Sequence, residues 1–346
     1  MRIKENGKFS LIVPSAWLGG PTYKTLRNIL LNYKVDNILL LPFDVFADAY
    51  VDTTIFVATK SKFNQLHKVH TFVYGKRVKL TEIELAENCY ELVAQKQWVK
   101  SADKKFTLDP KTLSLIENIL QKTNLHFDDV ITIRRGVLFD RALLTDNRTT
   151  EMCHRYFEGD VYRYQINHKA PQWIEFCDKI KERPKEFIWF KGPRILLRRL
   201  VNRRQRLMAS IVSDTFITNK NLYSILLKAG DFNIPSILGL LNSRLISYLY
   251  INQITQATKD DFPQVTIKDI LALPFPNIAE KTPYLRMASL VEQMLALNMQ
   301  FTGIKTPHEK TAIERQIDAT DRQIDTLVYE LYGLTEEEIS IVEQKA

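Results

Sequence analysis

The sequence has few cysteines and no long apolar segment. Its three cysteines, Cys89, Cys153 and Cys177, are too few and too scattered for a disulfide framework or a metal-binding CxxC pair. No stretch reaches the roughly 18 apolar residues that a membrane span needs, and the N-terminus carries charges where a signal peptide has its apolar run. We therefore expect a soluble, cytoplasmic protein with reduced thiols, no metal site and no membrane partner.

Acidic residues are the minority among the charged side chains. The 346 residues include 48 Lys and Arg against 40 Asp and Glu, which gives a net charge of +8 and an isoelectric point near 9.2. A basic balance favours a polyanionic partner, provided that the cations gather in one region. With 45% hydrophobic and 25% charged residues, the composition is that of a globular protein, and the length allows two domains.

The first sixty residues predict an α/β unit. Residues 8–14 ("KFSLIVP") and 35–42 ("VDNILLLP") are short apolar runs typical of strands, and residues 21–34 have apolar side chains at helical spacing. The β-branched run from Val51 follows too closely for a second crossover helix, which predicts an antiparallel return. We expect the edge of a larger α/β sheet, a parallel pair of strands plus an antiparallel strand, that buries too little surface to be stable alone.

A loop with two phenylalanines precedes the last of these strands. The segments "GKFSLIVPSAWL" and "LPFDVFADAYVDTTIFVATK" resemble the closing strands of the amino adenine-N6 DNA methyltransferases of the Taq type. The resemblance implies the edge of a Rossmann-like methyltransferase sheet. It also implies that Phe46 covers a target adenine turned out of the duplex, where an aromatic face replaces the lost stacking. The alternative is that Phe43 and Phe46 only cap the hydrophobic edge of the sheet.

The catalytic and cofactor motifs of that family are missing. The chain has no tetrapeptide of Asn or Asp, two prolines and an aromatic residue, and its 11 glycines form no Gly-rich turn for S-adenosylmethionine. In the family both motifs lie upstream of the Val-Pro-x-x-Trp strand. The resemblance implies that S-adenosylmethionine serves the complete enzyme and that the catalytic half is encoded upstream, in the same or an adjacent gene. We expect this chain, as a split or truncated product or a fragment, to be inactive by itself.

Cationic residues concentrate in the second half of the chain. The run "ITIRRG" predicts a strand that ends in two guanidinium groups beside a glycine that allows close backbone approach. The runs "RILLRRLV" and "RLMASIV" around "NRRQ" predict a hairpin with an arginine tip, suited to a DNA groove because Arg pairs bidentately with guanine. A solvated hairpin is the alternative. The predicted DNA contacts are Arg134, Arg135, Gly136, Arg194, Arg198, Arg199, Arg203, Arg204, Lys220 and Lys259.

The order of segments in residues 127–276, with "ILGLLNSRLISYLYINQIT" and the exit "ILALPFP", resembles the target-recognition domain of the same family. Type I specificity subunits have a similar helix and exit. Residues 156–167 ("YFEGDVYRYQIN") predict a further strand, and Asp109 with Pro110 fits the N-cap and first residue of a helix. Beyond this domain, Gly333 fits a helix C-terminus, and Thr335 with Glu338 fits a capping box. We predict four parts: the end of a catalytic domain (1–62), a connecting α+β segment (63–126), a mixed α+β target-recognition domain (127–282) and a helical tail (283–346).

Two functions remain open. The chain is either part of an adenine-N6 DNA methyltransferase of a restriction-modification system, reading double-stranded DNA and stacking the target base, or a non-catalytic DNA-binding specificity subunit. Residues 1–60 favour the first function, because a pure specificity subunit has no use for strands of a catalytic domain.

Overall fold

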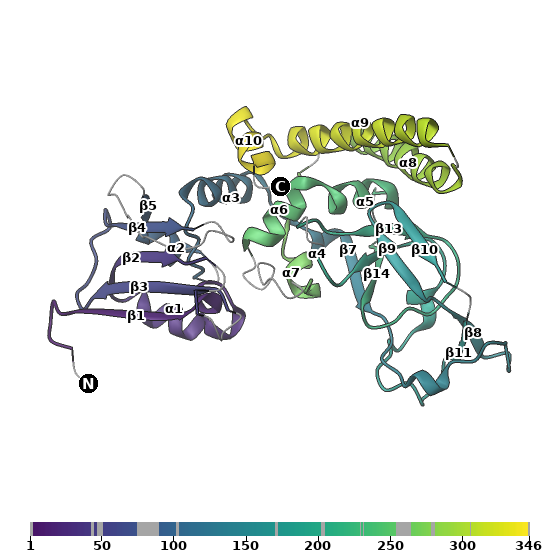
Figure 1. Ribbon diagram of the computed structural model, residues 1–346, viewed down its shortest axis with the longest axis horizontal. Helices are drawn as coiled ribbons and strands as arrows, with labels where there is room; N and C mark the ends of the chain where they lie inside the picture. Colours follow the sequence, from purple (N-terminus) through teal and green to yellow (C-terminus); the bar gives the residue numbers. More distant parts are fainter. Residues whose placement is uncertain are drawn as a thin grey trace. The chain divides into compact units, whose positions relative to one another are not determined.

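The computed structural model (Figure 1) describes residues 3–42, 45–46, 51–74, 90–101, 104–169, 172–201, 205–228, 230, 232–253, 264–277, 281–304 and 306–344. Contacts between Cα atoms divide the chain into two compact units. Unit 1 comprises Met1–Asn118 with Ile251–Asp261, and unit 2 comprises Ile119–Tyr250 with Phe262–Ala346. Both units combine helices with strands, so the chain is a mixed α/β protein.

Unit 1 is built on a five-stranded sheet with the strand order β1-β3-β2-β4-β5. Strand β3 is antiparallel to both β1 and β2, and β4 is parallel to β2. The elements are β1 (Lys8–Pro14), η1 (Ser15–Leu18), η2 (Pro21–Tyr23), α1 (Lys24–Leu30), β2 (Lys34–Leu40), β3 (Thr53–Thr59), β4 (Lys68–Val73), β5 (Glu91–Ala94), α2 (Gln95–Lys100) and α3 (Pro110–Lys122).

One face of this sheet is packed into a core. Trp17 of η1 contacts Phe56 of β3, with the rings 5.3 Å apart, and its indole N–H donates to Thr54 at 3.1 Å. Trp98 of α2, also in the core, donates to the Thr107 carbonyl at 2.9 Å. Because side chains alternate along a strand, the opposite face carries different residues, and Ile12 on β1 is 49% exposed there.

The strands and the helices predicted for unit 1 are largely confirmed, but their arrangement differs from the prediction. The return strand β3 is antiparallel as expected, yet it lies between β1 and β2, so those two strands share a direction without pairing with each other. Helix α3 begins at Pro110, as predicted, and the carboxylate of Asp109 accepts from the backbone N–H of Lys111 at 3.0 Å. The four-part division of the chain stays a prediction, although β4 and β5 complete the sheet of β1 to β3.

Unit 2 contains a four-stranded antiparallel sheet with the order β13-β12-β14-β7. Its strands and smaller hairpins are β6 (Leu125–His126), β7 (Ile131–Arg135), β8 (Cys153–Tyr156), β9 (Gly159–Tyr162), β10 (Gln165–His168), β11 (Gln172–Glu175), β12 (Arg194–Arg198), β13 (Ala209–Val212), β14 (Leu222–Leu227) and β15 (Pro274–Phe275). The predicted hairpin of β12 and β13 is confirmed. Residues 156–167, expected as one strand, instead form the β9–β10 hairpin, which turns at Tyr164 with a φ of 60°.

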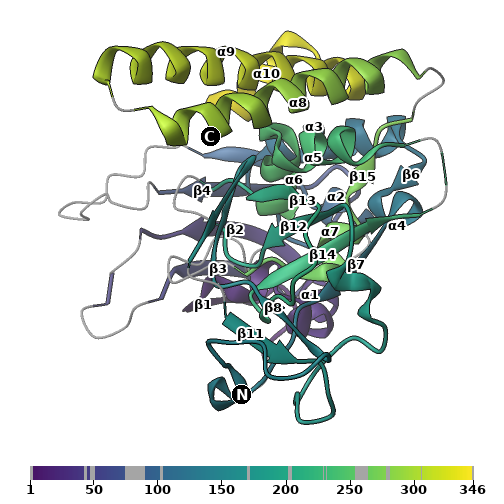
Figure 2. The ribbon, with the colours of Figure 1, turned by 90° about the vertical axis from the view of Figure 1, so that its right-hand side faces the viewer.

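Helices cover the rest of unit 2. They are α4 (Phe127–Val130), η4 (Arg141–Leu143), η5 (Phe187–Phe190), α5 (Ile234–Asn242), α6 (Arg244–Gln253), α7 (Ile267–Leu271), α8 (Thr282–Gly303), α9 (Pro307–Tyr332) and α10 (Glu336–Gln344). Figure 2 shows α8 and α9 side by side as a long helical hairpin. The predicted C-terminal cap of α9 is confirmed, since Gly333 adopts a left-handed conformation with a φ of 60°. The predicted capping box is also present, because Thr335 and Glu338 each accept the other's backbone N–H.

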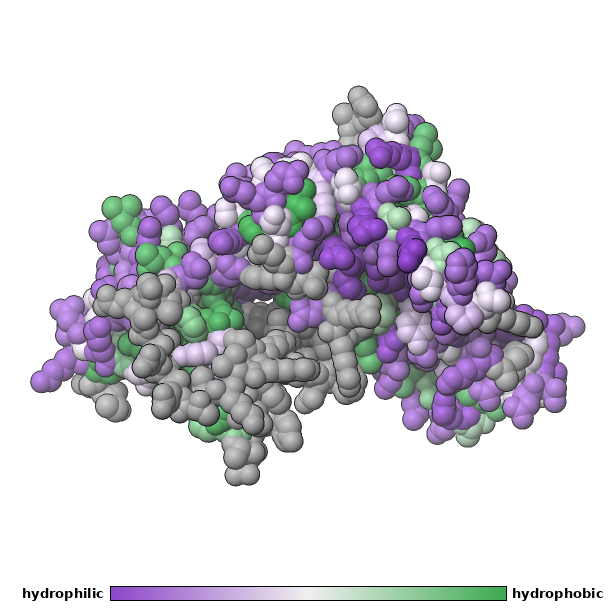
Figure 3. All heavy atoms as spheres, turned by 45° about the horizontal axis from the view of Figure 1, so that its top comes forward, coloured by the Kyte–Doolittle hydropathy of each residue, from purple (hydrophilic) through white to green (hydrophobic). Residues whose placement is uncertain are grey.

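The apolar helices α5 and α6 belong to the interior of unit 2. Among the described residues, no single helix is long and apolar enough to cross a bilayer; α5 and α6 together satisfy length and composition, but they bend by 57° where they meet. Their apolar side chains are buried, as shown by Ile237, Leu238, Leu241, Leu245, Ile246 and Leu249, each 0% exposed. On the face of the molecule drawn in Figure 3, hydrophilic residues predominate and apolar ones form smaller patches.

Candidate nucleic-acid interface

Several of the predicted cations in the described part of unit 2 meet at one end of the four-stranded sheet. Strand β7 ends at Arg135 and β12 ends at Arg198, whereas β14, antiparallel to both, begins at Leu222. The ends of these three strands therefore lie together. This sheet end carries Arg134, Arg135, Gly136, Arg198, Arg199 and Lys220.

Two guanidinium groups flank a tyrosine at this sheet end. Tyr223 lies opposite Arg135 in the β7–β14 pairing, is 5% exposed, and donates from its hydroxyl to the Val265 carbonyl at 2.7 Å. Burial raises the pKa of Tyr223, while the positive charges of Arg199 and Arg135 act in the opposite direction. The two guanidinium groups thus lie near a neutral phenol. Tyr223 carried no separate signal in the sequence, because it reads as one more apolar residue of "NLYSILL".

Neighbouring groups hold these guanidinium groups in place. Arg135 donates from Nε to the Lys220 carbonyl at 3.2 Å, and its Nη1 lies 3.5 Å from Glu182. Arg199 donates from Nη2 to the side chain of Gln264 at 2.5 Å. Arg side chains fixed in this way lose less conformational entropy when they bind a phosphate or a base edge.

Arg134 and Gly136 flank Arg135 and have different roles. Arg134 is exposed and lies over the Trp189 ring at 5.3 Å. Gly136 allows the close backbone approach that the sequence predicted, but the approaching chain belongs to the same unit, because a Cβ at this position would lie 2.2 Å from the Asn219 carbonyl oxygen. Its N–H donates to Leu222 at 2.9 Å. We therefore leave Gly136 out of the proposed DNA contacts.

Arg194 lies at the opposite end of β12 and is buried, with 0% exposure. Its guanidinium group donates to the carbonyls of Gly192, Asp214 and Phe216 at 3.1, 2.8 and 3.2 Å and packs over the Phe216 ring. A side chain that caps three interior carbonyls has no face for DNA in this fold. The structure thus corrects the prediction for Arg194, and the dense run of cations in residues 191–206 does not form one surface.

A buried ionic network ties the base of the β12–β13 hairpin to helix α9. Arg206 is 8% exposed and donates to the Asn242 carbonyl at 2.7 Å. Asp325 of α9 lies 3.9 Å from Arg206 and 3.2 Å from Arg244, and accepts from the Arg244 backbone N–H at 2.8 Å. Burial raises the pKa of Asp325 and lowers the pKa of Arg206 to about 10, so both ions are kept at a desolvation cost that their pairing and the bonds to Arg244 and Asn242 offset.

The network extends to the β9–β10 turn. Arg163 in this turn forms a two-point ion pair with Asp321 of α9 and donates from Nε to the Asn242 carbonyl at 3.1 Å. The β9–β10 turn and the base of the β12–β13 hairpin are therefore held by one turn of α9. Composition could not have shown this, because Arg163 and Asp321 are 158 residues apart.

Some predicted contacts lie outside the described residues. These are Arg203 and Arg204 at the hairpin tip, Lys259, and Phe43 in the loop of unit 1. Phe46 is described and is 43% exposed. It lies in the connection from β2 to β3, next to the sheet end where β1 and β2 have their carboxyl termini, since Pro14 and Leu40 pair with Thr53 and Thr54.

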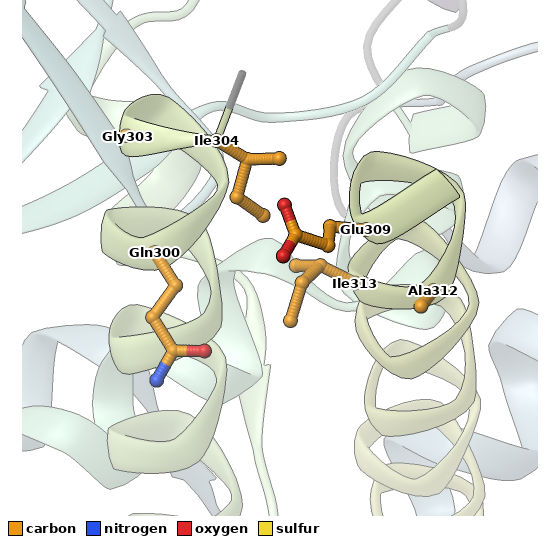
Figure 4. A pocket seen from close by; sticks show the side chains of 6 residues that line it. All are labelled: Gln300, Gly303, Ile304, Glu309, Ala312 and Ile313. Atoms are coloured by element: carbon orange, nitrogen blue, oxygen red, sulfur yellow. The ribbon is translucent and has the colours of Figure 1, made fainter. Parts of the chain in front are cut away.

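Two other features of the described residues offer little chemistry. A pocket of about 520 Å³ lies at the tip of the α8–α9 hairpin, where Figure 4 shows the Glu309 carboxylate beside Ile304 and Ile313. Thr306 donates to that carboxylate at 2.5 Å, so the acid serves the start of α9. Within the part of the chain that the structure describes, no three His, Cys, Asp or Glu side chains gather as metal ligands would.

Residues 154–275, which include Arg198, Arg199 and Lys220 of this sheet end, match the family model of the TaqI-like C-terminal specificity domain. Over 336 residues the chain is 29% identical to a protein of Methanocaldococcus jannaschii named as a type II restriction enzyme and methyltransferase, a match that covers 95% of this chain and 27% of the relative.

The fold of the whole chain also has a counterpart. It resembles the type IIL restriction-modification enzyme MmeI, solved in complex with DNA, with a TM-score of 0.60 and 12% identity over 99% of this chain and 50% of MmeI. At this identity the likeness concerns the fold alone. The chain spans about a quarter of the M. jannaschii relative and half of MmeI.

Proposed function

We propose that this chain is the DNA-recognition part of an adenine-N6 DNA methyltransferase of a restriction-modification system. The observation that carries the proposal is the end of the four-stranded sheet of unit 2, where Arg135 and Arg199 are fixed on either side of Tyr223. Guanidinium groups held at defined positions suit both phosphate contact and bidentate pairing with guanine. Arg134, Arg198 and Lys220 extend the same charge around the sheet end.

We assign unit 1 to the end of the catalytic domain. In this assignment the ring of Phe46 stacks on the extruded adenine. Two observations support this role: the ring is accessible, and its loop leaves the sheet at the carboxyl ends of β1 and β2, where open α/β sheets bind their ligands. S-adenosylmethionine would supply the methyl group in the complete enzyme. Its binding turn and the acceptor tetrapeptide are assigned to an upstream part, because this sequence contains neither.

The edge strand β1 is the proposed attachment site for that upstream part. Among the described strands, β1 pairs with β3 only, which leaves one row of its backbone groups for another strand. Leu11 and Ile12 on β1 are 52% and 49% exposed, and Ile29 on α1 is 52% exposed. Exposed apolar side chains beside an edge strand favour docking of more sheet. A pure specificity subunit, the second candidate, would have no use for this edge.

Binding of duplex DNA by the full chain tests the recognition role. Removal of a cation that contacts a phosphate should lower the slope of log K against log salt by about 0.9, equally for all sequences. A base-reading Arg should instead cost roughly 1–3 kcal/mol at one base position. We expect Arg135→Ala and Arg199→Ala to show one of these two patterns in fluorescence anisotropy with labelled duplexes of varied sequence.

Arg286→Ala is the matched control, because Arg286 on α8 is exposed and only loosely paired, at 4.0 Å from Glu330. It should leave binding unchanged. Unchanged binding in both test variants, or no binding of duplex DNA by the intact chain, would contradict the proposed function. Calorimetry with S-adenosylmethionine should give no heat of binding from this chain alone; a micromolar signal would contradict the assignment of the cofactor site to the upstream part.

A further inference from the structure

A second group of cations lies at one end of the unit 1 sheet, on the face opposite the core. Lys8 of β1 and Lys34 of β2 both lie opposite Thr59 of β3, so these three side chains share one face. The β2–β4 register places Lys68 of β4 on this face too. Phe56, in the core, is three residues from Thr59 and so points to the other face. Lysines from three strands therefore form a row across the open face.

The connection that follows β3 brings two more lysines to this end of the sheet. The backbone N–H of Lys34 donates to the Ser61 carbonyl at 2.9 Å. On the other side, the backbone N–H of Lys60 donates to the Gly7 carbonyl, also at 2.9 Å. Lys62, the next lysine along the connection, is exposed. The main chain thus gathers lysines from four separate segments of the sequence.

The carboxylates at this end do not balance the lysines. Asp36 lies 3.5 Å from the ammonium group of Lys34 and 3.7 Å from that of Lys8, so two cations share one carboxylate. Glu5 lies 4.0 Å from the ammonium group of Lys60, and its own side chain is 70% exposed. The group therefore keeps a net positive charge on an accessible surface.

We propose that this lysine surface contacts the phosphates of duplex DNA independently of the base sequence. Its members are Lys8, Lys34, Lys60, Lys62 and Lys68. Neighbouring strands lie about 5 Å apart, so the row from β1 to β4 is about 15 Å wide, which matches about four base pairs along a duplex. An ammonium group is a point charge on a flexible stem and has no planar fork to match a base edge. These contacts should therefore add affinity without base preference. The identity of the polyanion rests on the proposed function.

The lysine surface is separate from the other surfaces of unit 1. It lies where β1 and β2 begin, whereas the loop of Phe46 lies where these strands end. Each strand has seven residues and is therefore about 20 Å long. The lysines would thus contact the duplex outside the target base pair. Ile12 of the proposed docking edge is about 13 Å from Lys8 along β1.

Salt titration of duplex binding by the full chain tests this surface. The triple variant Lys8→Gln, Lys62→Gln, Lys68→Gln retains Lys34, so that Asp36 keeps a partner. Its slope of log K against log salt should be lower by about 0.9 for each of these lysines that contacts a phosphate, and by about 2.7 if all three do. We expect the same decrease for every duplex sequence in fluorescence anisotropy.

A matched control removes the same charge from other parts of unit 1. Lys24→Gln, Lys100→Gln and Lys111→Gln replace exposed lysines on α1, α2 and α3. This control should keep the salt slope of the unaltered chain, because it changes the net charge equally but removes no proposed contact. Equal melting temperatures of the two triple variants show that neither has lost its fold.

The outcomes separate this inference from the proposed function. If both triple variants have the same salt slope, the inference fails, and the variants of Arg135 and Arg199 still decide the proposed function. If those arginine variants bind normally while the lysine variant alone loses slope, the proposed function fails and the lysine surface stands. A lysine variant that keeps its salt slope but binds the upstream polypeptide more weakly would assign the surface to an acidic protein segment and reject the inference.

Discussion

The two units differ in what they leave exposed. Unit 1 presents large apolar side chains at the edge of an open sheet, among them Leu11, Ile12 and Ile29. Unit 2 buries the apolar residues of α5 and α6 and presents cations fixed by aromatic rings, carbonyls and single carboxylates, although Leu285 and Met299 on α8 are also exposed. We propose another protein segment as the partner of the β1 edge and a polyanion as the partner of the sheet end of unit 2. The two surfaces thus differ in the class of partner that we propose for them.

The largest expected effect concerns the integrity of unit 2. Asp325→Ala leaves Arg206, which is 8% exposed, without its carboxylate partner in the interior. Loss of one member of a buried pair costs about 3–5 kcal/mol, so the free energy of unfolding of unit 2 should fall by that amount in urea denaturation. Arg286→Ala breaks an exposed pair and should change it by less than about 1 kcal/mol. Equal effects of the two variants would remove the contrast between buried and exposed ions.

Unit 1 offers the same contrast between a buried and an exposed side chain, in two of its phenylalanines. Phe56 is 2% exposed and Phe46 is 43% exposed. Phe56→Ala should lower the free energy of unfolding by about 3–5 kcal/mol, whereas Phe46→Ala should lower it by less than about 1 kcal/mol. Melting of the two variants measures this difference. If Phe46 proves as costly as Phe56, it is an edge cap and not a platform.

Methylation activity tests whether the exposed ring of Phe46 has the proposed stacking role. In an enzyme reconstituted with the upstream part, Phe46→Ala should slow single-turnover methylation and weaken the fluorescence of a 2-aminopurine target that reports extrusion, with DNA affinity nearly intact. Phe46→Trp should retain most of the rate, because another large aromatic face can stack on the base. A normal extrusion signal per folded molecule in the alanine variant would reject the stacking role.

The smallest effect is expected for the exposed edge of unit 1. Ile12→Lys should leave the stability of the isolated chain within about 0.5 kcal/mol, because the side chain is already 49% exposed. Its association with the upstream part should weaken about tenfold or more, since an unpaired ammonium would be buried there. Leu66→Lys, at a position 78% exposed in the turn before β4, is the control. Surface plasmon resonance with the upstream polypeptide measures both, and equal affinities would argue against docking at β1.

The sequence predicted those elements whose signals are local. Strands β1 and β2, the start of α3 at Pro110 and the cap at Gly333 follow from apolar runs and from capping residues within a few positions. The place of β3 between β1 and β2 could not be predicted, because strand order depends on pairing across the sheet. The β9–β10 turn was missed because its left-handed residue is Tyr164, which carries no turn signal.

The site was predicted only in part for a similar reason. The cluster of Arg134, Arg135, Arg198 and Arg199 was found because charge density marks it. Charge density could not show that Arg194 faces the interior, since that depends on the carbonyls of residues 192, 214 and 216.

Arg206 and Arg163 are both anchored to helix α9, outside the strands that they adjoin. Asp325 holds Arg206 from outside the strands and Gln264 holds Arg199, so the segment between Arg199 and Arg206 is bounded by two positions that the rest of unit 2 supports. Loops exchanged within those bounds retain their anchors, whereas a graft that includes Arg206 without its partner on α9 loses one. The natural unit of exchange is therefore the loop between the anchors and not the hairpin.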